Sequence, residues 1–194
     1  RWAIVEELCR RGTEADREAL AETVHTDVVY DRVTLAARAL ATLGDERLLA
    51  AVEDYFARED VFEDPSRRLS GYDRMRRSAL EDYVEHLPMD RQLELARAWH
   101  TRGGHFAMLA GRIFGDQATP DDRVRLEAFI AQEDDDCTGY EVLNELLALG
   151  RIGDPRSAPL LVRVAEQATY SLARRRALQA LAGMQQLPIA VTAL

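Results

Sequence analysis

Lysine is absent from this 194-residue chain, and all 25 basic residues are arginine. Surface physics alone does not drive lysine to zero, so we interpret the bias as that of a GC-rich bacterial gene. The only two cysteines, Cys9 and Cys137, lie far apart and lack CxxC or metal-ligand spacing. This excludes a disulfide-rich scaffold and favours a reduced, cytoplasmic location. No run approaches the roughly 18 apolar residues of a membrane span, so we expect no membrane contact.

Aromatic residues are also few, at 7% of the chain, and only six prolines and eleven glycines interrupt it. β-Branched residues never gather into alternating runs, so the composition favours helix. Hydrophobic residues make up 47% and charged residues 30%, which is the balance of a soluble globular protein. Acidic residues outnumber basic ones by 34 to 25, giving a net charge of −9. Because this charge repels a phosphate backbone, we expect no nucleic-acid partner.

The chain repeats itself. A first apolar helix, a polar turn and a second apolar helix recur roughly every 34 residues, which is the period of helical hairpins. A hairpin patterned in this way cannot bury its apolar stripes alone, so neighbouring hairpins are expected to stack. The predicted turns fall at Gly12, Gly44, Pro88, Gly115, Gly153 and Gly183.

Local signals at these turns agree with the helix boundaries. Glycine is suited to the left-handed residue that closes a helix, and we expect it in that role at the five turn glycines. The acidic residues that follow, Asp45, Asp116 and Asp154, are expected to cap or bridge into the next helix. Thr13 and the Asp three residues after it resemble a capping box, and the proline after Asp154 suits a first helical turn.

Two segments carry a resemblance to a known family. GRIGDPRSAPLL, residues 150–161, and GDERLL, residues 44–49, resemble the HEAT-repeat superfamily, especially the HEAT-like repeats of phycobilisome lyase subunits. The resemblance implies an all-α fold, a right-handed α-solenoid of about five hairpins plus a terminal helix, with the second helices lining a concave surface. We expect residues 1–194 to form a single HEAT-like repeat domain, a fragment or most of a longer array. Such arrays mostly bind other proteins, although a few are enzymes.

An acidic residue followed closely by arginine opens nearly every second helix. A cation in the first turn opposes the helix dipole, so each arginine needs a carboxylate nearby. We expect the adjoining repeat to supply it and to form an inter-repeat ladder, with the arginines near the rim of the concave face. The pairs are Asp16-Arg17, Asp45-Arg47, Asp90-Arg91, Asp122-Arg123 and Asp154-Arg156.

The candidate partner contacts are charged and aromatic residues of the second helices. Their mixed charge is typical of a protein surface and not of a phosphate track. Aromatic anchors are common interface hot spots, but Phe56, Trp99 and Phe129 could equally belong to the core. The candidates are Arg47, Glu53, Asp54, Arg91, Glu94, Arg97, Trp99, His100, Arg123, Arg156 and Arg163.

Motifs for catalysis and metal binding are absent from the sequence. It has no Walker loop, GxGxxG or GxSxG, and it lacks the His-Glu dipeptides of the iron-binding HEAT-like hydroxylases. His100 and His105 have no carboxylates at metal spacing, and the acidic run at residues 133–137 lacks the spacing of a calcium loop. We therefore predict no metal, no cofactor and no catalytic residue.

Two functions from different classes remain. The first is a non-catalytic scaffold or adaptor that uses its concave face to bind another protein or peptide. The alternative is a small-molecule enzyme or a lyase-type accessory subunit, in which Glu53 or Asp54 assists as an acid. A HEAT-like glycosylase is disfavoured by the net charge of −9.

Overall fold

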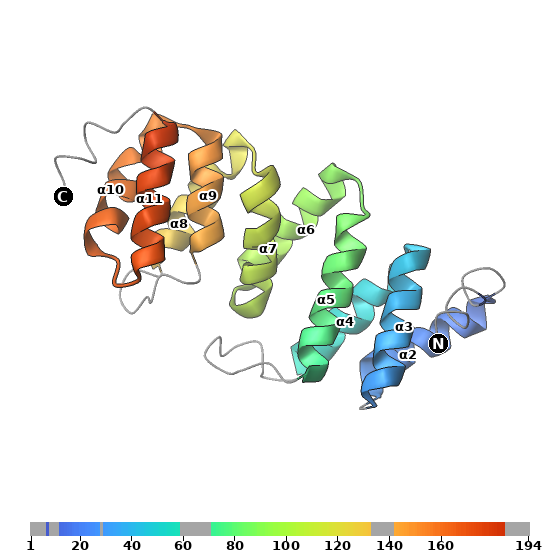
Figure 1. Cartoon of the computed structure of the whole chain (residues 1–194). Helices are drawn as coiled ribbons and strands as arrows, with labels where there is room; N and C mark the ends of the chain where they lie inside the picture. Colours follow the sequence, from blue (N-terminus) through green and yellow to red (C-terminus); the bar gives the residue numbers. More distant parts are fainter. Residues whose placement is uncertain (1–6, 8–11, 28, 59–70, 133–141, 185–194) are drawn as a thin grey trace. The chain divides into compact units, whose positions relative to one another are not determined.

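The computed structural model describes residues 7, 12–27, 29–58, 71–132 and 142–184 (Figure 1). Within these ranges the chain forms ten α-helices, two short 3-10 helices and no strand, which confirms the all-α prediction. Both cysteines and the acidic run at residues 133–137 lie outside the described residues. The helices are α2 (Glu14–Thr26), α3 (Tyr30–Leu43), α4 (Arg47–Arg58), α5 (Gly71–Glu85), α6 (Met89–Arg102), α7 (Gly104–Gln117), η2 (Pro120–Asp122), α8 (Arg123–Gln132), α9 (Leu143–Ile152), η3 (Pro155–Ser157), α10 (Ala158–Gln167) and α11 (Ser171–Gly183).

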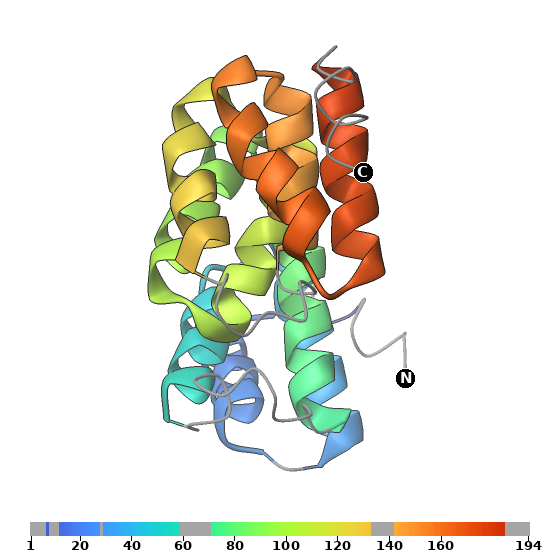
Figure 2. The ribbon, with the colours of Figure 1, turned by 90° about the vertical axis from the view of Figure 1, so that its left-hand side faces the viewer.

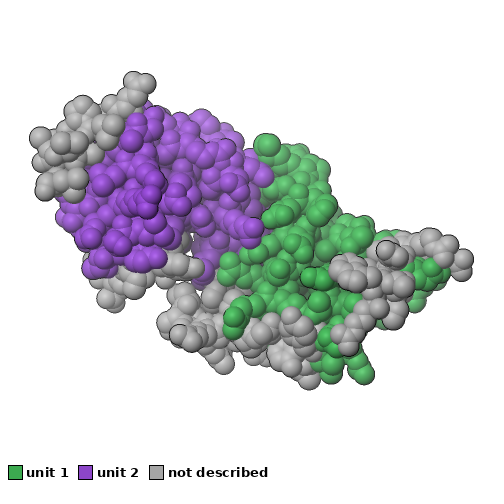
Figure 3. All heavy atoms as spheres, viewed as in Figure 1, with its two compact units in different colours: residues 1–92 green, residues 93–194 purple. Residues whose placement is uncertain are grey.

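The chain divides into two compact units (Figure 3). Unit 1 comprises residues 1–92 and unit 2 comprises residues 93–194, so the division falls inside α6. Each unit has its own set of packed helices and its own buried residues, described separately below. The expectation of one continuous repeat domain over residues 1–194 stays a prediction.

In unit 1 the helices pack on both their chain neighbours and the helices two positions away. Helix α2 contacts α3 and α4, and α3 contacts α4 and α5. The predicted apolar stripes are buried at Leu40 and Leu48, which are both 0% exposed. A charged residue also lies in this core: Arg76 of α5 donates hydrogen bonds to the carbonyls of Val24 and Asp27, at 2.7 and 2.8 Å. The guanidinium thereby satisfies carbonyl groups at the end of α2.

Unit 2 repeats this pattern of contacts. Helix α9 contacts α7, α8 and α11, and α10 contacts α11, so α9, α10 and α11 lie side by side (Figure 2). The core is built from large apolar side chains of successive helices. In both units, therefore, a helix contacts the helix two positions further along the chain. The most buried apolar residues of unit 2 include Phe114, Leu126, Leu146, Leu149 and Leu161.

Four of the predicted turns or helix ends are confirmed and one is wrong. Gly44 and Gly153 close α3 and α9 in the left-handed conformation, with φ of 62° and 69°, and the chain turns at Pro88 between α5 and α6. The last predicted helix end is also confirmed, because α11 ends at Gly183. Gly115, in contrast, lies inside α7. The expected left-handed conformation is wrong at both Gly115 and Gly183, because neither is among the glycines with positive φ. The prediction for Gly12 cannot be compared, because residues 8–11 beside it are outside the described ranges.

Two glycines of unit 2, Gly150 and Gly183, lie where helices α9 and α11 approach each other closely. A Cβ built on Gly150 of α9 would lie 2.9 Å from both Cα and Cβ of Ala180 in α11. Gly183 faces the same helix, since its Cβ would lie 3.6 Å from the carbonyl oxygen of Gly150. Glycine at these positions lets helix backbones pack at short range, so helix packing, and not turn geometry, accounts for Gly150.

The helix starts largely follow the predicted caps. Thr13 and Asp16 form a capping box, with a 2.7 Å hydrogen bond from the Thr13 amide to the carboxylate. The carboxylates of Asp45 and Asp154 each accept an amide hydrogen bond from the residue two positions later. The prediction for Asp116 is wrong, because α7 continues through it to Gln117. Its capping role falls instead to a Thr–Asp box at the start of η2, described below.

Candidate functional site

Arginines of one second helix bind the carboxylate that opens the next second helix. In unit 2, Arg97 of α6 donates from Nε and Nη2 to the two carboxylate oxygens of Asp122, at 2.7 and 3.1 Å. Asp122 also accepts hydrogen bonds from the amide and hydroxyl of Thr119, which complete the capping box. Burial raises the pKa of Asp122, but the donors from Arg97 and Thr119 outweigh this and hold the pKa below its ordinary value.

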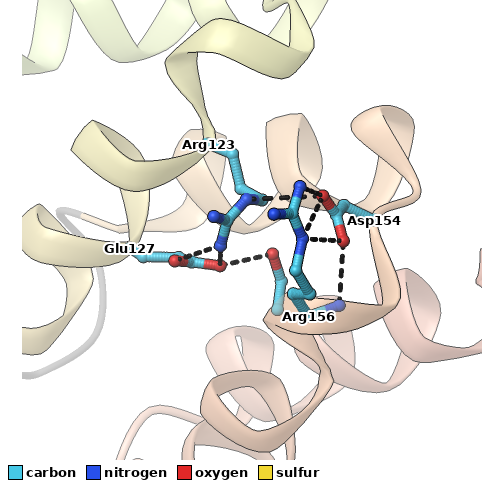
Figure 4. Close-up of polar contacts among 5 residues, drawn as sticks. Arg123, Glu127, Asp154 and Arg156 are labelled. Carbon is cyan, nitrogen blue, oxygen red and sulfur yellow. Dashed lines mark hydrogen bonds and ion pairs between the residues drawn. The ribbon is translucent and has the colours of Figure 1, made fainter.

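The next link in unit 2 joins α8 to the turn before α10 (Figure 4). Arg123 Nε lies 3.4 Å from Asp154 Oδ2, and Arg123 Nη1 lies 2.7 Å from both oxygens of Glu127. Ser157 donates its hydroxyl proton to the same Glu127 at 2.7 Å. Hydrogen bonds from Arg156, with a further contribution from Arg123, lower the pKa of Asp154 to about 2. The five groups form one connected network of charges.

Unit 1 contains the equivalent link between α2 and α4. Arg17 Nη1 lies 3.5 Å from Asp45 Oδ2, and Arg47 binds the same oxygen at 2.8 Å. Arg47 also pairs with Glu14 of the preceding second helix. The predicted inter-repeat ladder is thus confirmed between α2 and α4 and between α8 and α10. Arg97 supplies the α6–α8 link from the middle of its helix, at a position the pattern did not predict.

Most of the predicted partner contacts are at least partly exposed. The exposed ones include Asp54 and Arg156, whose side chains are 63% and 73% exposed. The network described above ties Arg47, Arg97, Arg123 and Arg156 to carboxylates of the same unit. Arg91 and Glu94 are exposed on α6, whereas Glu53 and Arg163 are half-buried.

Two predicted contacts are corrected by the structure. Trp99 and His100 are only 2% and 6% exposed, so neither offers its ring to a partner. The ring of Trp99 packs 6.2 Å from that of Phe106, and Trp99 therefore belongs to the core, as the alternative interpretation held. Phe129 is half-buried, and the side chain of Phe56 lies outside the described atoms.

His100 belongs to a buried polar cluster that the sequence did not reveal. Its ring lies 4.4 Å from that of Phe129 and 5.3 Å from that of Phe114. Nε2 lies 3.8 Å from Oε1 of Glu145, which is fully buried. Burial lowers the pKa of His100 to about 4, and the charge of Arg125 adds to the shift. His100 is therefore neutral at neutral pH and packs as an aromatic ring.

A glycine makes room for this buried carboxylate. A Cβ on Gly111 of α7 would lie 2.3 Å from Oε1 of Glu145 in α9. Any side chain at that position would force the carboxylate to move, so the glycine and the glutamate are spatially coupled. The only signal in the sequence is a glycine in an apolar helix, which does not indicate what faces it.

A cleft on unit 1 was also missed. It has a volume of about 460 Å³ and lies between α3 and α5. Its charged lining comes from two helices that are separated in the sequence by α4, so no local spacing indicates it. The lining includes Thr34, Arg38, Arg74, Met75, Ser78 and Asp82.

Comparison with known proteins identifies no relative: no family model, no curated protein and no solved structure matches the chain. The HEAT-like resemblance therefore stays a prediction. Among the described residues, no three His, Cys, Asp or Glu side chains are arranged to hold a metal ion. None of the described helices has the length and apolar content needed to cross a bilayer.

Proposed function

We propose that the chain is a protein-binding module, a right-handed α-solenoid whose second helices line a concave face for another protein or peptide. The observation that carries this proposal is the recurring arginine–carboxylate link between alternate helices, at Arg17–Asp45 in unit 1 and at Arg97–Asp122 and Arg123–Asp154 in unit 2. Stacking of equivalent hairpins produces such a repeat of one contact, because each hairpin meets its neighbour in the same way.

The ladder also divides the second-helix charges into two groups. Arg97 and Arg123 form ion pairs with carboxylates of their own unit, so these two side chains stabilise the packing of its helices. Asp54 on α4 and Arg91 and Glu94 on α6 remain exposed and carry both signs of charge. Mixed exposed charge supports a protein or peptide partner and gives little attraction for nucleic acid. Composition supports a bacterial, cytoplasmic setting.

The alternative of a small-molecule enzyme has less support. It relied on Glu53 or Asp54 as an acid in an enclosed groove. Asp54 is 63% exposed and lies 3.8 Å from Nε2 of His25. A side chain exposed to this extent is open to solvent and does not lie in an enclosed groove.

Site-specific photocrosslinking tests the proposal. A benzophenone amino acid placed at Asp54 or at Glu94 reports contacts of the second-helix face in a lysate of the source organism. The matched control is the same probe at Asp116, an exposed acidic residue of α7, which is the first helix of its hairpin. We expect one protein to be crosslinked from both second-helix positions and not from Asp116.

Charge reversal then separates binding from mere proximity. D54R and E94R should each weaken capture of that protein, whereas D116R should leave it unchanged. Equal crosslinking from all three positions, or capture that resists both second-helix reversals, would refute binding by this face.

A further inference from the structure

The imidazole of His100 lies where four helices of unit 2 meet. Its side chain, on α6, is only 3% exposed, and the rings of Phe114 from α7 and Phe129 from α8 lie 5.3 and 4.4 Å away. From α9, Oε1 of Glu145 lies 3.8 Å from Nε2, which is beyond hydrogen-bond distance. Among the described residues, therefore, a proton on the buried Nε2 has no acceptor in this closed arrangement.

The charges around the ring do not compensate for its burial. Arg125 of α8 disfavours a second cation, Asp122 of η2 favours one, and the carboxyl group of Glu145 faces the ring from α9. Asp122 is already paired with Arg97 of α6. Burial is the largest of these effects and keeps the pKa of His100 at about 4. The same ring in water takes up a proton near pH 6.5, so acid favours any arrangement that exposes it.

Helix α8 covers the ring on the side that borders solvent. Phe114 is fully buried, whereas Phe129 is half-buried. On the same helix, Arg125 donates from Nη1 to the carbonyl of Arg97 and to the hydroxyl of Thr101, at 3.0 and 2.8 Å, and so ties α8 to α6. A positive charge on the imidazole repels this arginine and requires hydration, and both effects act on α8.

We propose that α8 is a cover that acid opens: when His100 takes up a proton, Phe129 leaves the imidazole and Arg125 leaves the end of α6. The close contact of α9 with α11, at Gly150 and Ala180, involves none of these groups and stays closed. Unit 1 contributes no group to this cluster and keeps its packing. The opening is therefore local and precedes the unfolding of unit 2.

Hydrogen–deuterium exchange of the whole chain tests the proposal. Between pH 7.5 and pH 4.5, after correction for the intrinsic exchange rate, the amides of α8 should become up to about 70-fold less protected. This factor follows from a pKa of about 4 in the closed arrangement and about 6.5 in the open one. At pH 4.5 the amides of α11 should remain about tenfold or more better protected than those of α8, and α3 in unit 1 should show no such loss.

Two variants isolate the role of His100. H100F keeps a ring in these aromatic surroundings but cannot take up a proton, so α8 should keep its protection in acid. H86Q removes an exposed histidine of unit 1 and should leave the acid response of α8 unchanged. In the unaltered chain, the NMR titration of the His100 ring should have the same midpoint as the loss of protection in α8. This last measurement does not depend on the folding of a variant.

Three results would overturn the proposal. Equal protection of α8 and α11 at pH 4.5 would mean that unit 2 unfolds as a whole. Greater protection of α8 in acid would mean that the imidazolium pairs with Glu145 and tightens the packing. Loss of protection in α8 that persists in H100F would assign the acid response to carboxyl groups such as Asp122.

Discussion

The close approach of α9 and α11 makes a quantitative prediction for Gly150→Ala. The added methyl would lie 2.9 Å from Cα and Cβ of Ala180, which is well inside ordinary van der Waals contact. Because Cα belongs to the backbone, the contact can be relieved only by moving one helix. Overpacking of this kind costs about 1–3 kcal/mol. Alanine recovers up to about 1 kcal/mol of that cost, since it is the better helix former.

Gly115→Ala is the matched control, because it makes the same change inside a neighbouring helix of unit 2. The atoms nearest to its new methyl lie at 3.7 Å, so the methyl fits, and the variant should gain up to about 1 kcal/mol from helix propensity. The two variants should therefore differ by about 1–3 kcal/mol in the free energy of unfolding, with Gly150→Ala the less stable.

Urea denaturation followed by circular dichroism measures this difference, with the slope on denaturant checked for a common unfolding transition. Adding Ala180→Gly to Gly150→Ala should restore only part of the loss, because the backbone contact remains. A Gly150→Ala protein as stable as Gly115→Ala would refute the close approach, and complete rescue by Ala180→Gly would show that only the methyl groups clash.

Three further predictions concern the turn, the ladder and the buried histidine. Gly153→Ala should cost about 1–2 kcal/mol, because φ is 69° at this helix end, and Gly153→Asn should cost less in the same urea assay. Asp122→Ala should lower the free energy of unfolding by about 1–3 kcal/mol through loss of the cap and of the Arg97 pair, whereas the neighbouring Asp121→Ala should have little effect. For His100, the folded-state pKa of about 4 lies below the ordinary 6.5, so its neutral form contributes stability that is complete above about pH 6.5 and is lost as the pH falls toward 4. His100→Gln should flatten this part of the stability profile, which amounts to about 3 kcal/mol, and an unchanged pH dependence would contradict the assignment.

Local signals in the sequence were sufficient to predict the helices, the two turns at left-handed glycines and most of the helix caps. Gly44 and Gly153 follow apolar helices and precede an aspartate, and the structure has both in the left-handed conformation that closes a helix. The link between Arg17 and Asp45 could also be predicted, because a cation in a first turn requires a carboxylate and the repeat period brings one close. Such features depend on residues that lie a few positions apart, or one repeat period apart, in the sequence.

The tertiary structure decided everything that depends on which helix faces which. Gly115 and Gly150 occur in similar apolar helices, yet only Gly150 meets a neighbouring backbone closely. Trp99 and His100 share a helix with exposed charges, and their burial depends on residues of α7, α8 and α9 that pack around them. Helical periodicity gives the spacing of an apolar face, but the partner of that face is set by packing between segments distant in the chain, and so are buried polar pairs and clefts.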